Sequence, residues 1–87
     1  MKTRVKKGLA SRRIGGELFI VDAAGSRLHE LNETGAFIWE GLAAGRGDEV
    51  IAAGLAGDFD VDGAAALSDL RAFIRELGAA GLMSDGE

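Results

Sequence analysis

A seam at residues 31–40 constrains the fold of this chain more than any other stretch. Before the seam, apolar and polar residues alternate as they do in β-strands. After the seam, apolar residues recur at helical spacing. Asn32 stands at the seam and is a good helix N-cap, because its side-chain oxygen can accept from free N–H groups of the first turn. Glu33 follows where the helix dipole favours negative charge. The only tryptophan, Trp39, belongs to this predicted helix, which we expect to pack on both sides.

The segment before the seam predicts three short strands joined by two tight turns. Residues 9–14 can form the first strand, and Gly15-Gly16 accepts the positive φ angles of a two-residue hairpin turn. Residues 17–22 form the second strand, since they are rich in β-branched and aromatic side chains. After a turn at residues 23–26, residues 27–31 form the third strand. Consecutive tight turns make an antiparallel meander, in which the third strand is expected at an edge.

Two helices are predicted directly after the seam. The first runs from Asn32 to about Ala44, and Gly45 suits the position just beyond its end. The second starts at Gly47-Asp48, with Asp48 as the expected N-cap. Its glycines weaken it by up to about 1 kcal/mol each relative to alanine. Its predicted core face consists of Val50, Ile51, Leu55 and Phe59.

The third helix carries the clearest apolar stripe. We expect Asp62 to cap it, Gly81 to end it after about Ala80, and residues 82–83 to dock back on the core. Its stripe consists of Leu67, Leu70, Ile74 and Leu77, widened by Ala66 and Phe73. A three-stranded antiparallel sheet followed by three helices is an α+β domain of winged-helix-like architecture. One core is predicted from Leu31, Ile38, Trp39, Leu55, Leu70, Ile74 and Leu77.

The charged residues beside this stripe are sorted by sign. A helical wheel places Arg71 and Arg75 on one flank of the stripe, and Asp69 and Glu76 on the other. These flanks are either ordinary solvated surface or, on the basic side, the border of a groove for an acidic ligand.

The charge is also divided along the chain. Six basic residues and no acid occur up to Arg13, whereas four basic residues and fourteen acids follow from Ile14 onward. This basic N-terminal arm either improves solubility or meets an acidic partner. The acidic remainder is a poor candidate for binding a phosphate backbone. A small winged-helix DNA-binding protein therefore stays as the alternative function, with nucleic acid as an unfavoured partner.

The residue types predict no catalytic site, metal site or cofactor. His29 is the only histidine, cysteine and tyrosine are absent, and no serine or threonine lies in a nucleophile-elbow or phosphate-loop context. Asp58–Gly63 matches the first six positions of a calcium-binding loop, but Asp62 is better placed as a helix N-cap. With no signal peptide and no long apolar run, we expect one cytoplasmic domain at residues 1–87, ordered over about 5–83, and no membrane contact.

Several segments resemble the coenzyme PQQ synthesis protein D (PqqD) family. The most specific is Leu31-Asn32-Glu33-Thr34-Gly35 leading into Ile38-Trp39, and the likeness extends from about Val5 to Met83. The other segments that carry it are residues 17–22, 59–62, 69–74 and 81–82. The chain departs from the family at His29, where relatives usually have an aromatic residue. It also departs in its second helix and the start of its third, which are unusually rich in Gly and Ala.

The resemblance implies a non-catalytic recognition element, or peptide chaperone, for a ribosomally made precursor peptide. The leader of the precursor would add as a strand to residues 27–31 and lie against the third helix. The domain would then present it to a modifying enzyme, often a radical SAM enzyme. The implied peptide-binding residues are Arg27, Leu28, His29, Glu30 and Leu31 in the strand and Leu67, Leu70, Arg71, Ile74 and Arg75 in the helix. Independently, an edge strand beside an apolar helix permits binding by strand addition.

Overall fold

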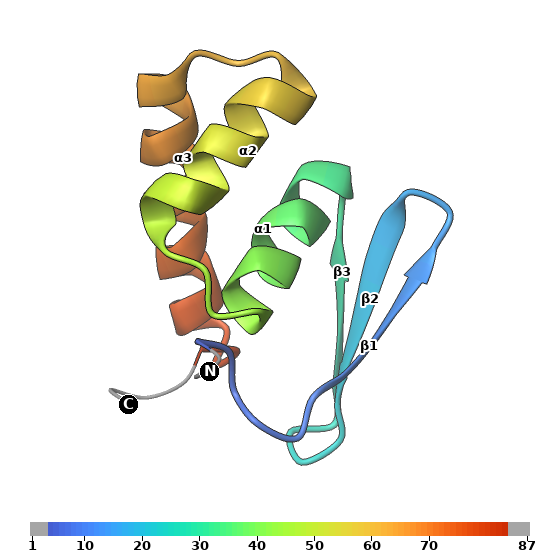
Figure 1. Cartoon of the computed structure of the whole chain (residues 1–87). Helices are drawn as coiled ribbons and strands as arrows, with labels where there is room; N and C mark the ends of the chain where they lie inside the picture. The colour runs from blue at the N-terminus through green and yellow to red at the C-terminus, as the bar shows by residue number, and fades with distance from the viewer. Residues whose placement is uncertain (1–3, 84–87) are drawn as a thin grey trace.

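The computed structural model describes residues 4–83 and confirms the predicted order of elements. Strands β1 (Ala10–Ile14), β2 (Glu17–Asp22) and β3 (Arg27–Leu31) form one antiparallel sheet in the order β1-β2-β3. Helices α1 (Glu33–Ala43), α2 (Asp48–Phe59) and α3 (Gly63–Ala79) follow, and α1 lies between the sheet and the other two helices (Figure 1). Predictions on Lys2 of the basic arm and on residues 84–87 lie outside the described residues. The α+β, winged-helix-like architecture is confirmed.

The pairing of the strands sorts their side chains into two faces. β2 is central, so β3 is an edge of the described sheet, as predicted. Leu18 lies opposite Leu31, and Ile20 lies opposite His29. Leu18 and Ile20 are buried against the helices, so these four side chains belong to the inner face. In the β1–β2 turn, Gly15 has a φ of +65°, the conformation that the glycine pair is expected to supply.

The ends of α1 and α3 follow local rules that the sequence predicts. Asn32 caps α1, and its side-chain oxygen accepts a hydrogen bond from the Gly35 N–H at 2.8 Å. Asp62 caps α3 by accepting from two backbone N–H groups of the first turn. Gly45 and Gly81, just beyond the two helices, both have a φ of +79°. Both predicted N-caps and both glycine ends are confirmed.

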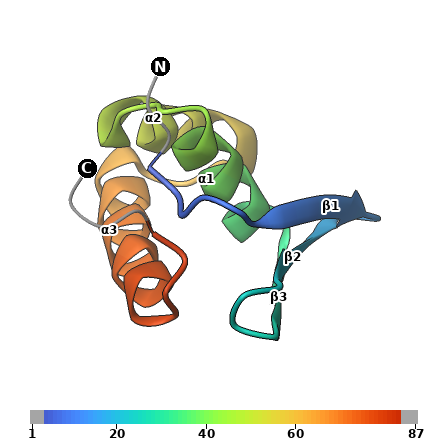
Figure 2. The ribbon, with the colours of Figure 1, turned by 90° about the horizontal axis from the view of Figure 1, so that it is seen from below.

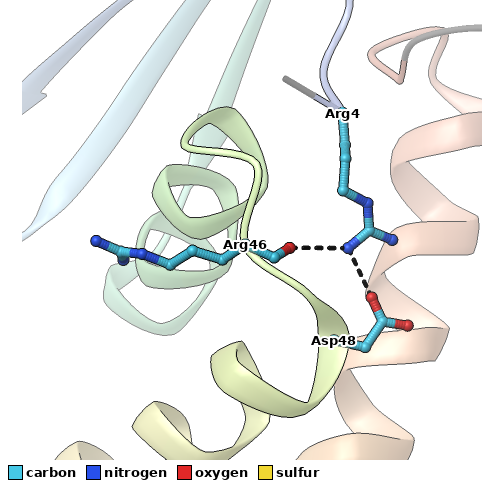
Figure 3. A network of polar contacts seen from close by, with 3 residues as sticks. All are labelled: Arg4, Arg46 and Asp48. Atoms are coloured by element: carbon cyan, nitrogen blue, oxygen red, sulfur yellow. Dashed lines mark hydrogen bonds and ion pairs between the residues drawn. The ribbon is translucent and has the colours of Figure 1, made fainter. Parts of the chain in front are cut away.

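Two predictions for α2 are wrong. The N-cap is Gly47, which makes no side-chain cap bond, and Asp48 is already helical. The Asp48 carboxylate instead binds Arg4. Nη1 of Arg4 donates to Asp48 Oδ1 at 2.6 Å and to the Arg46 carbonyl oxygen at 3.2 Å (Figure 3). Val50, predicted in the core, is 61% exposed. It lies about 100° from Ile51 around a helix, on the side away from the buried residues of α2.

One hydrophobic core lies between the inner face of the sheet and the three helices. All seven predicted core residues belong to it; Leu31 and Ile74 are half-buried at its edge, and the rest are buried. The two ends of the described chain pack together at this core, where Leu82 is buried. Val5 forms a β-bridge with Met83, and the Lys6 N–H donates to the Leu82 carbonyl oxygen at 2.9 Å. The two ends of the described chain therefore lie side by side (Figures 1 and 2).

Two glycines of α2 have opposite surroundings. A Cβ atom added at Gly54 would lie 2.6 Å from Cζ of Phe37, whereas one added at Gly57 meets nothing within 4 Å. The Phe37 ring cannot easily retreat, because it packs edge-to-face on Phe59 with ring centroids 5.7 Å apart. Gly54 therefore permits the close approach of α1 and α2, while Gly57 only weakens its helix.

We expect alanine to have opposite effects at these two positions. Gly57→Ala is expected to raise the free energy of unfolding by about 0.5–1 kcal/mol, because alanine favours the helix. Gly54→Ala is expected to lower it by about 1–3 kcal/mol through overpacking against Phe37. Urea denaturation of both variants measures the difference, and equal stabilisation would show that the ring moves away at little cost.

Candidate functional site

β3 presents a free backbone edge. Within residues 4–83 it pairs with β2 alone and also lies against α1, while α3 lies chiefly against α2. In the view from below, β3 lies at the side of the sheet that faces α3, with α1 above both (Figure 2). The outward N–H and C=O groups of β3 must be satisfied by water or by a partner strand.

A cleft of about 300 Å³ lies next to the end of β3, between α1 and α3. We call it the α1–α3 cleft; it is lined by Asn32, Thr34, Gly35, Ile38, Asp69, Phe73 and Glu76. Gly35 allows the walls of the cleft to approach each other closely. A Cβ atom at this position would lie only 3.1 Å from Cζ of Phe73 and 3.3 Å from Cβ of Leu31. This glycine therefore brings the last residue of β3, the first turn of α1 and the middle of α3 into contact.

The structure brings the five predicted strand residues together at the free edge. Arg27, His29 and Leu31 share the inner face, because they pair with the buried residues of β2. Leu28 and Glu30 are on the outer face, where Leu28 is 66% exposed. Of the inner-face residues, Leu31 lies next to the α1–α3 cleft, since it packs beside Gly35.

His29 has an unusual environment on that inner face. Its Nε2 atom is shielded from solvent and has no hydrogen-bond partner among residues 4–83. A buried polar atom left without a partner costs about 1–3 kcal/mol.

The predicted residues of α3 do not line the cleft. Leu70 is fully buried, and Leu67 and Ile74 are half-buried against the core. Arg71 and Arg75 are exposed and make no ion pair among residues 4–83.

The lining of the cleft comes instead from the other flank of α3. Asp69, Phe73 and Glu76 line it, whereas the family resemblance implies Arg71 and Arg75 of the opposite, basic flank. A wheel groups residues by side but does not say which side turns toward β3. The only sequence signal for this side is Phe73, the one aromatic residue of α3, which widens the stripe toward the acids.

Half of the basic residues of the N-terminal arm are engaged within the chain. Three of its cations form ion pairs: Arg4 with Asp48 at 2.6 Å, Lys6 with Asp22 at 3.1 Å and Arg13 with Glu40 at 2.9 Å. The hydrogen bond from Lys6, helped by the Gly25 N–H, lowers the pKa of the buried Asp22 carboxyl. The hydrogen bond from Arg13 likewise lowers the pKa of Glu40. These cations are therefore less available to an acidic partner than the sequence suggests.

A second concavity lies on the outer face of the sheet. It measures about 470 Å³ and is lined by Ala10, Ser11, Arg12, Ile14, Phe19 and Val21. Because this lining comes from β1 and β2, the concavity does not border the free edge of β3. On the same face, the hydrogen bond and charge of Glu30 raise the pKa of Glu17.

No group of three or more His, Asp or Glu side chains in residues 4–83 is arranged to hold a metal ion. Within the same residues, no helix is long and apolar enough to cross a membrane.

Comparisons with known proteins agree with this fold. The family model described as coenzyme PQQ synthesis protein D (PqqD) matches residues 17–83. The structure of TbiB1 in complex with the TbiA(beta) leader peptide is similar, with a TM-score of 0.87, 25% identity and 98% of both chains covered. Lasso peptide synthetase B1 complexed with the leader peptide shares the fold at a TM-score of 0.85 and 21% identity, over 94% of this chain and 96% of that chain. No curated protein matches the sequence.

Proposed function

Because this chain belongs to the PqqD family, we propose that it binds the leader of a ribosomally synthesised precursor peptide and presents it to a modifying enzyme, without catalysing a reaction itself. The observation that carries the proposal is the free edge of β3 beside the α1–α3 cleft. The similar TbiB1 structure, which holds a leader peptide, supports it.

The leader would add to β3 as a fourth strand. Main-chain hydrogen bonds to residues 27–31 would supply affinity without regard to sequence. Alternate side chains of the added strand would face inward, toward His29 and the α1–α3 cleft. There Phe73 and the buried Ile38 offer an apolar surface. Specificity would therefore reside in the cleft, and affinity largely in the strand.

The residues predicted from the sequence take different parts in this proposal. Arg27, Leu28, His29, Glu30 and Leu31 contribute their backbone, and the inner-face residues also contribute side chains. Leu67, Leu70 and Ile74 contribute by holding α3 in place, since they pack in the core or at its edge. We propose that residues 1–87 act as one cytoplasmic domain and that the receiving enzyme is a radical SAM enzyme, as the family resemblance implies.

The DNA-binding alternative is less well supported. A winged-helix protein reads DNA with a helix rich in basic and amide side chains. Here α2 has no basic residue, α3 carries acids on its cleft side, and three cations of the basic arm are paired within the chain.

An amide chemical-shift titration tests the proposed function. The probe is a synthetic leader peptide from a short reading frame beside this gene. We expect the shifts to concentrate in residues 27–31 and around Gly35 and Phe73, because these positions form the edge and the cleft. Shifts confined to the N-terminal arm, or an equal response to duplex DNA, would contradict peptide binding and favour the nucleic-acid alternative.

A further inference from the structure

The α3 wall of the α1–α3 cleft is acidic. Asp69, Phe73 and Glu76 stand at positions i, i+4 and i+7 of α3, so they share one face, with the ring between the two carboxylates. Both carboxylates are exposed, and neither makes an ion pair or hydrogen bond among residues 4–83. The cleft therefore offers an apolar surface between two charges that no cation of the described chain neutralises.

The opposite wall does not supply the missing positive charge. It consists of Asn32, Thr34, Gly35 and Ile38, none of them basic. The start of α1 carries partial positive charge from the helix dipole, but Glu33 in the first turn opposes it. The capping oxygen of Asn32 already accepts from the Gly35 N–H. The charge of the cleft is therefore set by Asp69 and Glu76.

We propose that this cleft selects leaders in which a lysine or arginine lies two positions from an apolar residue. The inference rests on the proposed function. Residues two apart on a strand share a face, so the apolar side chain would meet Phe73 while the basic one reaches a carboxylate of α3. This preference is opposite in sign to the acidic ligand expected if Arg71 and Arg75 bordered the groove.

Selection from a displayed library of random peptides tests the preference and does not require the natural leader. The wild-type domain is expected to enrich peptides with Lys or Arg spaced two residues from an apolar residue. The charge-reversed variant Asp69→Lys with Glu76→Lys is expected to enrich Asp and Glu instead. The variant Arg71→Glu with Arg75→Glu tests the opposite flank, and it should keep the wild-type preference.

Affinity measurements on a selected basic peptide provide a second readout. Asp69→Asn with Glu76→Gln removes both charges at nearly constant shape, and it is expected to weaken binding by about 2- to 30-fold at low salt. The wild-type affinity should fall with added salt, and that of the neutral variant should fall less. Circular dichroism checks that each variant keeps its fold.

The outcomes separate the inference from the function on which it rests. Peptides that bind at β3 with no charge bias, or with a bias that only the Arg71 and Arg75 variant changes, would overturn the inference and leave leader binding intact. A library that yields no peptide binding at β3 would contradict the proposed function, and the inference with it.

Discussion

Truncation of Leu70 to alanine is expected to lower the free energy of unfolding by about 2–5 kcal/mol, which is a large part of the total stability of a small domain. Leu70 is fully buried in the core, where α3 meets the rest of the domain. Removing its side chain leaves a cavity that the surrounding residues only partly fill. Urea denaturation, read as a shift in midpoint at constant slope, measures the loss.

Val50→Ala is the matched control for this truncation. Val50 also lies on a helix but is 61% exposed, so its truncation should change stability by no more than about 0.5 kcal/mol. An unchanged midpoint for Leu70→Ala would contradict the core described above. A large loss for Val50→Ala would mean that α2 turns Val50 toward the core and not toward solvent.

Helix ends are predictable from sequence where the partners are neighbours in the chain. Asn32 and Asp62 cap α1 and α3 through N–H groups two or three residues away, so local rules suffice. The same local rule predicts Asp48 as a cap, yet its carboxylate binds Arg4, a residue 44 positions earlier. Such a distant partner becomes visible only once the N-terminal segment is placed beside α2.

The same distinction holds for the candidate site. The edge position of β3 follows from two short turns, which force neighbouring strands to pair in order. The side of α3 that borders the cleft depends on how α3 rotates against α1, and the contact of Gly35 with Phe73 shows that rotation. The stripe of α3 is therefore predictable from the sequence, whereas the sign of the charge beside the cleft is not.

Proline substitutions in β3 are expected to distinguish the N–H groups at the free edge from the N–H groups that bond to β2. In an antiparallel pair, successive residues point their N–H groups alternately toward the neighbouring strand and away from it. His29→Pro and Glu30→Pro therefore remove one N–H of each kind. One variant should lose a bond to β2 and with it much of the domain's stability. The other should remain as stable as wild type, because proline is tolerated at an open strand edge.

The variant that stays folded is expected to lose leader binding at least about tenfold, because proline removes a donor and its ring blocks an added strand. Alanine at the same position should reduce binding far less, since main-chain pairing depends little on side-chain identity. Urea denaturation identifies the folded variant, and calorimetric titration with a selected peptide measures its affinity. Wild-type affinity in that variant would show that the peptide does not pair with β3. Loss of affinity with unchanged stability would place the added strand on the edge that the sheet leaves open beside α3.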